Sequence, residues 1–187
     1  MDVRPKLERY PIQVSLQDGL RVTVRPLEPR DKVALLEFFR EVPEEDRFYL
    51  KENVTAPEVI HRWTEHIDYE RVVPLVALVD GRIVADATLH RSRSPARRHV
   101  GELRVVVDPQ FRNRGLGTRL VHELVDLAVA IGLEKVFMEL VDRRESAAIQ
   151  TALDAGFQEV AVLRDRIVDI YGSHQDLCIM ELDLRED

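Results

Sequence analysis

The stretch from Val105 to Thr118 constrains the fold of this 187-residue chain more than any other. It begins with three consecutive valines, which are typical of a buried β-strand, and Asp-Pro then ends that strand. Gly115 and Gly117 follow, and glycine allows a sharp turn that leaves room for an approaching group. From Leu116 onward apolar residues recur at helical spacing, which predicts a helix with one buried face. The order is therefore strand, glycine-rich turn and helix.

The turn lies at the N-terminus of the predicted helix. Main-chain N–H groups there lack intrahelical acceptors, and the helix end carries roughly half a positive charge. Such a terminus binds an anion, commonly a phosphate. Arg112, Arg114 and Arg119 lie beside it, and we expect them to add positive potential. The alternative is an ordinary strand-to-helix corner with solvated arginines.

Two common phosphate-binding loops do not fit this turn. No lysine follows the glycines, as the Walker loop requires, and Leu120 stands where a dinucleotide loop has its third glycine. The remaining pattern is V-x-P-x-x-R-x-x-G-x-G. It is matched without gaps by Val107, Pro109, Arg112, Gly115 and Gly117. This pattern closely resembles the acyl-CoA-binding motif of the Gcn5-related N-acetyltransferase (GNAT) family.

The resemblance implies acetyl-CoA as co-substrate, with its pyrophosphate on the turn and its pantetheine arm along the preceding strand. The coenzyme-binding residues expected from it are Val105, Val106, Val107, Arg112, Asn113, Arg114, Gly115, Leu116, Gly117 and Thr118. It also implies that a main-chain amide near Val106 or Val107 polarises the thioester carbonyl. No metal ion is expected.

Composition narrows the class of protein. A hydrophobic content of 45% and a charged content of 33% are ordinary for a soluble globular domain. The net charge of −7 argues against general nucleic-acid binding, and no apolar run approaches the roughly 20 residues of a membrane helix. A single cysteine, Cys178, excludes an intrachain disulfide and fits a reducing compartment. We therefore expect a cytoplasmic protein without nucleic-acid or membrane partners.

Hydrophobic periodicity predicts one domain over residues 20–184, while residues 1–19 have no clear period and are expected to form an arm or an edge addition. Strands are predicted at 20–26, 72–79, 82–90, 101–107, 134–141, 157–163 and 176–184, and helices at 29–40, 57–67 and 116–131, with a last one ending at Gly156. This is an α+β fold with a mixed sheet of about seven strands flanked by about four helices. The GNAT family has the same order of elements.

Acetyl transfer to an amine requires that the amine lose its proton. Strand alternation places Glu102 and Arg104 on one face of strand 101–107, and a carboxylate inside a sheet is unusual. Several members of the resembled family carry a glutamate near this point, so Glu102 is the predicted general base. The alternative is an ion pair of Glu102 with Arg104 or Arg91.

The neighbouring strand supplies a second candidate base, His90. Along this strand Ile83, Ala85, Ala87 and Leu89 are predicted on one face, and Val84, Asp86, Thr88 and His90 on the other. The second face is expected to adjoin Glu102.

The proton donor for the leaving thiolate departs from the family pattern. The family helix reads N-x-x-A-x-x-x-Y-x-x-x-G-F, of which Ala148, Gly156 and Phe157 are present. Glu145 replaces the asparagine and Ala152 replaces the tyrosine, and alanine cannot donate a proton. Either Tyr171 serves instead, or the thiolate leaves unaided beside solvent.

The resemblance therefore implies an acetyl-CoA-dependent N-acetyltransferase for a primary amine of a small molecule or a protein lysine. Ala152 leaves open a non-catalytic acyl-CoA-binding sensor or interaction module. A partner-binding domain without a ligand is a third alternative. Homodimers are frequent in the family, and the basic loop at 91–98 is expected to be a solvated surface loop.

Overall fold

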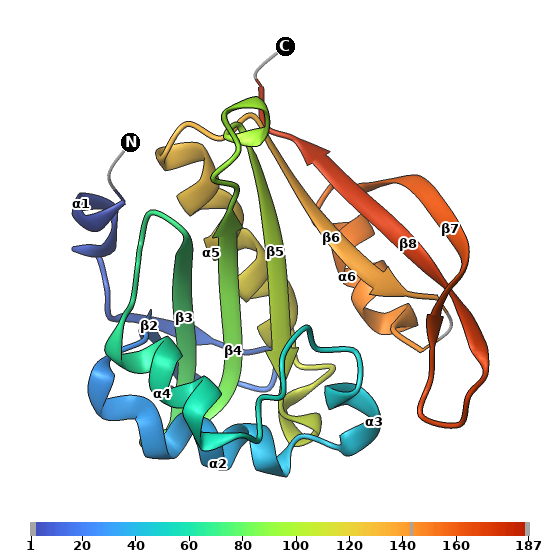
Figure 1. The fold of residues 1–187 in the computed structure, drawn as a ribbon. Helices are drawn as coiled ribbons and strands as arrows, with labels where there is room; N and C mark the ends of the chain where they lie inside the picture. The colour runs from blue at the N-terminus through green and yellow to red at the C-terminus, as the bar shows by residue number, and fades with distance from the viewer. Residues whose placement is uncertain (1–2, 143, 186–187) are drawn as a thin grey trace.

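The computed structural model describes residues 3–142 and 144–185. Eight strands form one sheet in the order β1-β2-β3-β4-β5-β6-β8-β7 (Figure 1). The strands are β1 (Ile12–Ser15), β2 (Arg21–Pro26), β3 (Val72–Val79), β4 (Arg82–Arg91), β5 (Val100–Val107), β6 (Lys135–Val141), β7 (Gln158–Val168) and β8 (His174–Asp183). The α-helices are α1 (Arg4–Leu7), α2 (Lys32–Glu41), α3 (Glu44–Arg47), α4 (Pro57–Glu65), α5 (Leu116–Ala130) and α6 (Ser146–Asp154).

Helices cover both faces of the sheet. On α5, Leu120, Leu124 and Leu127 recur at helical spacing and are buried in the larger apolar cluster, which also receives α6. On the opposite face, α2 and α4 bury Phe39 and Ile60 in a second cluster. The predicted α+β fold with a mixed sheet is therefore confirmed. Among the described helices, none is long and apolar enough to cross a membrane.

The strand beyond the predicted seven is β1, which comes from the N-terminal residues. It pairs antiparallel with β2 and forms one edge of the sheet. The segment before it is fastened to α5, because Arg9 and the Tyr10 hydroxyl both donate to the buried carboxylate of Glu123, at 2.5 and 2.9 Å. Residues 3–15 thus pack along the sheet edge and against α5.

The predicted faces of β4 hold from Ala85 onward but are wrong at Ile83 and Val84. The register between β3 and β4 shifts between Ala77 and Leu78, which is a β-bulge. A bulge inserts one residue into a strand and changes the face of those before it. Val84 therefore packs in the α5 cluster and Ile83 in the α2–α4 cluster, the reverse of the expectation.

The central feature of the sheet is the divergence of β5 and β6. These parallel strands pair only between residues 100–102 and 135–137. Beyond that point they separate, and β6 continues by pairing antiparallel with β8 (Figure 1). One edge of β5, from Leu103 to Val107, therefore has no paired strand. We call the opening between residues 103–107 and 138–141 the fork.

Candidate active site at the fork between β5 and β6

The turn between β5 and α5 presents a row of free main-chain donors. Asn113 and Gly115 have φ of 57° and 85°, and the amides from Asn113 to Thr118 donate no hydrogen bond to another described residue. The first helical bond runs from Arg119 N to Gly115 O, at 3.0 Å. Successive free N–H groups at a helix N-terminus form an anion site. The predicted phosphate turn therefore has the required geometry.

Gly117 tests whether this turn has room for a ligand. A Cβ placed on Gly117 meets only a methyl of Val107, at 3.9 Å, which is ordinary contact. Internal packing therefore does not require a glycine at this position. The missing side chain leaves open space over the turn, as a bound diphosphate needs.

The three arginines beside the turn are paired with carboxylates rather than free. The contacts are Arg112 with Asp46 at 2.8 Å, Arg114 with Asp18 at 3.0 Å and Arg119 with Glu123 at 2.6 Å. Arg112 also donates through Nε to Val107 O at 2.9 Å. The amides therefore supply more of the positive character than the sequence suggested, and Arg112 fixes the end of β5.

The free edge of β5 exposes alternate residues to the fork. Asp108 N donates to Val84 O at 2.9 Å, so the amide of Asp108 points toward β4. Because main-chain direction alternates, Val106 also points toward β4, while Val105 and Val107 point into the fork. Of the two amides expected to polarise a carbonyl, Val107 faces the fork and Val106 does not.

Glu102 lies where the fork begins. Its carboxylate accepts two hydrogen bonds from Arg104, both 2.8 Å, and one from Lys51 Nζ at 2.7 Å. Burial raises the pKa of Glu102, but the bonds from Arg104 and Lys51 together outweigh it and hold the pKa at about 2. The ion pair with Arg104 that the sequence offered as an alternative is thus present.

His90 is the direct cross-strand neighbour of Glu102. Its Nε2 lies 3.0 Å from the hydroxyl oxygen of Thr88 on the same face of β4. Burial, and then the positive charge of Arg104, lower the pKa of His90 to about 4. The imidazole is therefore neutral at pH 7. The structure brings together the two bases that the sequence predicted.

Asp86 is a third titratable group on this face, which the sequence reading did not single out. It pairs across the sheet with Val76 and Val106, and only 7% of it is exposed. Its carboxylate has no hydrogen-bond partner among the described residues, and burial raises its pKa to about 7. The signal in the sequence was a carboxylate within the apolar run from Ile83 to Ala87.

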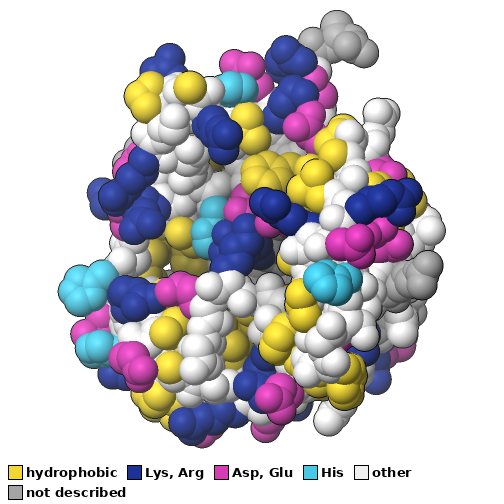
Figure 2. All heavy atoms as spheres, turned by 45° about the vertical axis from the view of Figure 1, so that its right-hand side comes forward, with side chains coloured by type: hydrophobic (Ala, Val, Ile, Leu, Met, Phe, Trp, Pro, Cys, Tyr) yellow, Lys and Arg dark blue, Asp and Glu magenta, His cyan; other side chains and the backbone are white. Residues whose placement is uncertain are grey.

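Lys51 and Glu139 were also missed by the sequence reading. The segment between α3 and α4 carries Lys51 to the start of the fork, where Nζ lies 2.7 Å from Glu102 and 2.9 Å from Glu139 on β6. One ammonium group therefore bridges the two diverging strands. Figure 2 shows a hollow on this side of the molecule, with basic, acidic and histidine side chains gathered at it. Residues 47–55 have no periodicity that could have indicated this position.

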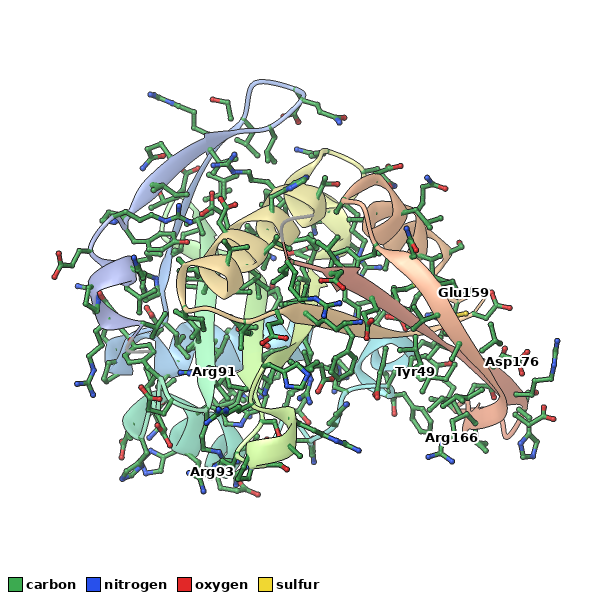
Figure 3. All side chains as sticks on the ribbon, turned by 90° about the horizontal axis from the view of Figure 1, so that it is seen from above. Tyr49, Arg91, Arg93, Glu159, Arg166 and Asp176 are labelled. Atoms are coloured by element: carbon green, nitrogen blue, oxygen red, sulfur yellow. The ribbon has the colours of Figure 1, made fainter. Side chains whose placement is uncertain are left out.

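Tyr171 lies apart from Glu102, at the turn between β7 and β8. Its side chain is 75% exposed, and its hydroxyl donates to Glu45 at 2.7 Å. Together with Tyr49, Glu45 and Asp169 it lines a cavity of about 330 Å³. Figure 3 shows Tyr49 on the same side as Arg166 and Asp176 of this hairpin. Tyr171 as proton donor stays a prediction.

The other departures from the family helix have structural explanations. Ala152 is fully buried in α6, where its methyl group packs in the larger apolar cluster and cannot donate a proton. Glu145 immediately precedes α6, and its carboxylate accepts a 2.6 Å hydrogen bond from Val141 N. Burial raises the pKa of Glu145. This carboxylate therefore ties the start of α6 to the end of β6.

A second cavity, of about 540 Å³, opens beside the phosphate turn. Residues 13–17 form one wall, and Arg114, Thr118 and His122 contribute to the other. Gln17 N donates to Arg114 O at 3.2 Å, so the β1–β2 hairpin supports the turn. The sequence reading assigned no such role to residues 1–19.

The basic loop after β4 behaves as a surface segment. Arg91 pairs with Glu70 and Arg93 with Asp68, both at 3.2 Å. Figure 3 shows both arginines away from the side that carries Tyr49. Among the described residues, no group of three or more His, Cys, Asp or Glu side chains is placed to hold a metal ion.

The chain matches known proteins both in sequence and in structure. The family model for the acetyltransferase (GNAT) family matches residues 35–157. The L-amino acid N-acetyltransferase AaaT of Escherichia coli is 27% identical over 107 residues, which are 57% of this chain and 64% of that protein. The [ribosomal protein bS18]-alanine N-acetyltransferase of Salmonella typhimurium is 35% identical over 78 residues, which are 42% of this chain and 51% of that protein.

Solved structures show the same fold. The putative acetyltransferase yncA from Salmonella typhimurium, solved with its cofactor acetyl-CoA, superposes with a TM-score of 0.75 at 23% identity. The match covers 89% of this chain and 95% of that chain. The chain thus spans less than two thirds of the length of the curated relatives that it matches in sequence, although it covers 95% of this structural neighbour. The family model covers most of the chain, including the strand, turn and helix of the fork, and the chain belongs to the GNAT acetyltransferase family.

Proposed function

We propose that this chain is an acetyl-CoA-dependent N-acetyltransferase that acetylates a primary amine of a small molecule or of a protein lysine. One observation carries the proposal. The free amides from Asn113 to Thr118 follow the free edge of β5 after one short turn at 108–112. A site for a diphosphate is therefore adjacent to an unpaired strand edge. The names of the curated relatives, which acetylate amino acids and a ribosomal protein alanine, support the reaction class.

The residues present fit acetyl-CoA, which supplies an activated acetyl thioester when bound. The turn amides hold the phosphates, and the cavity beside residues 13–17 receives the nucleotide end. Val105 and Val107 offer main-chain groups to the extended arm and to the carbonyl, as added strands do at a sheet edge. The thioester then lies in the fork near Glu102.

The polar residues at the start of the fork have two separate roles toward the amine, namely orienting it and removing its proton. With a pKa of about 2, Glu102 remains an anion and attracts and orients a cationic amine, but it is a weak proton acceptor. His90 is neutral at pH 7 and, with a pKa of about 4, is the stronger proton acceptor of the two, so it relays the proton of the amine to solvent. The leaving thiolate takes a proton from solvent or, as the sequence predicted, from Tyr171.

The proposal is tested by comparing Gly115→Ala with Gly172→Ala. Both glycines have positive φ, 85° and 82°, so both substitutions strain the backbone by roughly 1–2 kcal/mol. A Cβ at Gly115 adds bulk to the phosphate turn, 3.4 Å from Gln17, whereas a Cβ at Gly172 meets nothing within 4 Å. We expect Gly115→Ala alone to weaken acetyl-CoA binding in calorimetry, by about tenfold or more.

Thiol release with a panel of amines separates the competing functions. Turnover that Gly115→Ala lowers and Gly172→Ala leaves unchanged supports the acetyltransferase. Binding of acetyl-CoA without turnover of any amine would identify an acyl-CoA sensor instead. If calorimetry of the unmodified protein shows no heat of acetyl-CoA binding, the remaining alternative is a partner-binding domain without a ligand.

A further inference from the structure

Lys51 lies at the start of the fork, where the proposed function places the acetyl thioester. Its Nζ contacts Glu102 on β5 and Glu139 on β6, the two strands that diverge there. Strand pairing ends at Glu102, so the nitrogen lies at the first point where β5 offers a free edge. The amine is not sealed in, since 44% of the Lys51 side chain is exposed.

We propose that Lys51 is an intramolecular acetyl acceptor. When acetyl-CoA lies along the free edge of β5, the side-chain nitrogen of Lys51 takes the acetyl group and becomes N-acetyl-lysine. This inference rests on the proposed function, because it uses the same donor and the same fork. It adds a modification site on the chain itself.

The chemical step balances with acetyl-CoA alone. The Lys51 ammonium first loses one proton to solvent, which its partial exposure permits. The nitrogen lone pair then forms a C–N bond with the thioester carbon while the C–S bond breaks. The second nitrogen proton is released, and the coenzyme thiolate takes up one proton. The net products are acetyl-lysine, free coenzyme thiol and one proton.

Acetylation would change the electrostatics of the fork. A neutral amide cannot form the ion pairs with Glu102 and Glu139, so both carboxylates lose a cationic partner. Glu102 keeps its two bonds from Arg104 and stays in place. The positive charge of Lys51 also helps to lower the pKa of His90, so its loss favours proton uptake there. The acetylated chain therefore offers an anionic fork to an external cationic amine.

Mass spectrometry tests the modification directly, because the chain has few lysines. They are Lys6, Lys32, Lys51 and Lys135. The full-length protein is incubated with isotope-labelled acetyl-CoA, and the label on each lysine is followed with time. We expect Lys51 to be labelled at least tenfold faster than the others, with a rate constant independent of protein concentration. Lys51→Arg keeps the charge and removes this label, and Gly115→Ala slows it.

The outcomes distinguish this inference from the proposed function. Binding of acetyl-CoA and turnover of external amines, with Lys51 labelled no faster than Lys32 or Lys135, overturns the inference and leaves the function standing. A rate that grows with protein concentration means transfer between molecules and also overturns it. Failure of the protein to bind acetyl-CoA overturns both.

A second measurement needs no coenzyme. Lys51→Gln imitates the neutral acetylated side chain, and we expect it to raise the pKa of His90, followed by NMR, above that of the unmodified protein. Lys32→Gln is the matched control, because Lys32 contacts His61 and Glu65 rather than the fork. If the pKa of His90 is unchanged in Lys51→Gln, the ammonium of Lys51 does not lie near His90. That result would contradict the position of Lys51 on which the inference depends.

Discussion

At the scale of single residues, one face of β4 and β5 carries three side chains whose pKa values differ strongly from their ordinary values. Burial raises the pKa of Asp86 and lowers that of His90, whereas paired cations hold down that of Glu102. Groups with strongly shifted pKa values cluster at functional sites, because the charges that chemistry requires are costly to bury. Asp86 shows this cost most plainly, since no described residue compensates its charge.

Asp86→Asn is expected to stabilise the protein at neutral and higher pH. The pKa of Asp86 rises from 3.8 to about 7 on folding, so below pH 4 both states are protonated and burial carries no ionisation cost. As pH rises from about 4 to about 7, the unfolded state loses its proton first and stability falls, by on the order of 4 kcal/mol. Asparagine avoids this loss. Urea unfolding of both proteins at pH 4.5 and pH 8 measures the difference.

His90→Gln is the opposite control. The pKa of His90 falls from 6.5 to about 4 on folding, so its contribution to stability is complete above pH 6.5 and is lost as pH falls toward 4. Replacing His90 therefore removes a loss of stability that occurs between pH 6.5 and pH 4, whereas replacing Asp86 removes one that occurs as pH rises to 7. A gain from Asp86→Asn that is the same at pH 4.5 and pH 8 would contradict the assignment of a raised pKa to Asp86.

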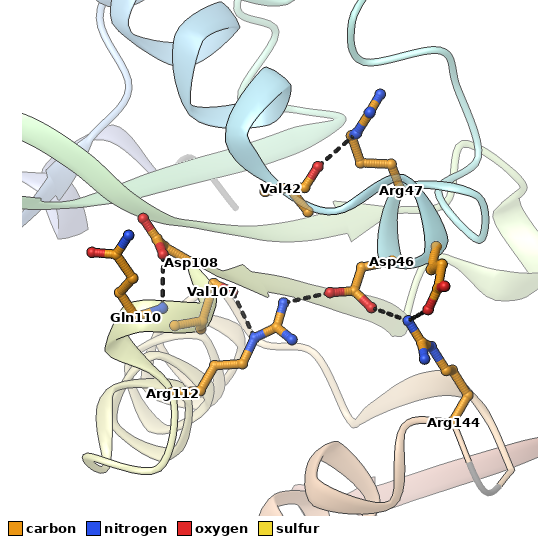
Figure 4. Close-up of polar contacts among 9 residues, drawn as sticks. Val42, Asp46, Arg47, Val107, Asp108, Gln110, Arg112 and Arg144 are labelled. Carbon is orange, nitrogen blue, oxygen red and sulfur yellow. Dashed lines mark hydrogen bonds and ion pairs between the residues drawn. The ribbon is translucent and has the colours of Figure 1, made fainter.

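At the scale of elements, the short helix α3 fastens the phosphate turn to the rest of the fork. Asp46 on α3 accepts from Arg112 at 2.8 Å and from Arg144, which follows β6, at 2.9 Å (Figure 4). Glu45 pairs with Arg144 and accepts from Tyr171 of the β7–β8 hairpin. Four segments distant in sequence therefore meet at one helical turn, although each exposed pair alone contributes little stability.

Asp46→Asn is expected to loosen α3 with a cost below about 1 kcal/mol in global stability. The amide loses the charge that holds both arginines, so hydrogen exchange in residues 44–47 and 109–114 should accelerate. Asp18→Asn is the matched control, since it removes a similar pair to Arg114 on the other side of the turn. Unchanged exchange around α3 in Asp46→Asn would show that the network does not hold the helix.

At the scale of the whole molecule, the N-terminal residues complete one edge of the sheet and form one wall of the cavity beside the phosphate turn. β1 covers the edge of β2, and Gln17 supports Arg114 of the turn. Arg9 and Tyr10 attach this segment to the buried Glu123 in α5. The helix that begins at the phosphate turn is therefore held in place by the N-terminal segment.

Removal of residues 1–19 is expected to lower both thermal stability and acetyl-CoA affinity. The deletion exposes the edge of β2, leaves Glu123 with Arg119 alone and removes one wall of the cavity beside the turn. Calorimetry should show affinity weakened by about tenfold, and scanning calorimetry a lower Tm. Gln17→Ala separates the effects, since it removes only the side chain at the turn. Full affinity in the deletion would show that residues 13–17 do not form part of the coenzyme site.

The sequence by itself determined the features that depend on neighbours along the chain. The strand, turn and helix from Val105 to Thr118, the strands at 72–79 and 82–90 and the buried stripe of α5 all follow from periodicity. The placement of Glu102 beside Arg104 follows from alternation within one strand. The bulge at Val84 escaped prediction because it depends on the register with another strand.

Only the tertiary structure determined where the strands of the fork separate and which side chains lie at it. The strand pairing that stops at Glu102 and the position of the Lys51 ammonium between two strands both depend on contacts between residues far apart in sequence. Such contacts leave no period in the chain, because either partner alone is compatible with many folds. Local chemistry determined the turn and its free amides, and long-range packing determined which side chains meet at the start of the fork.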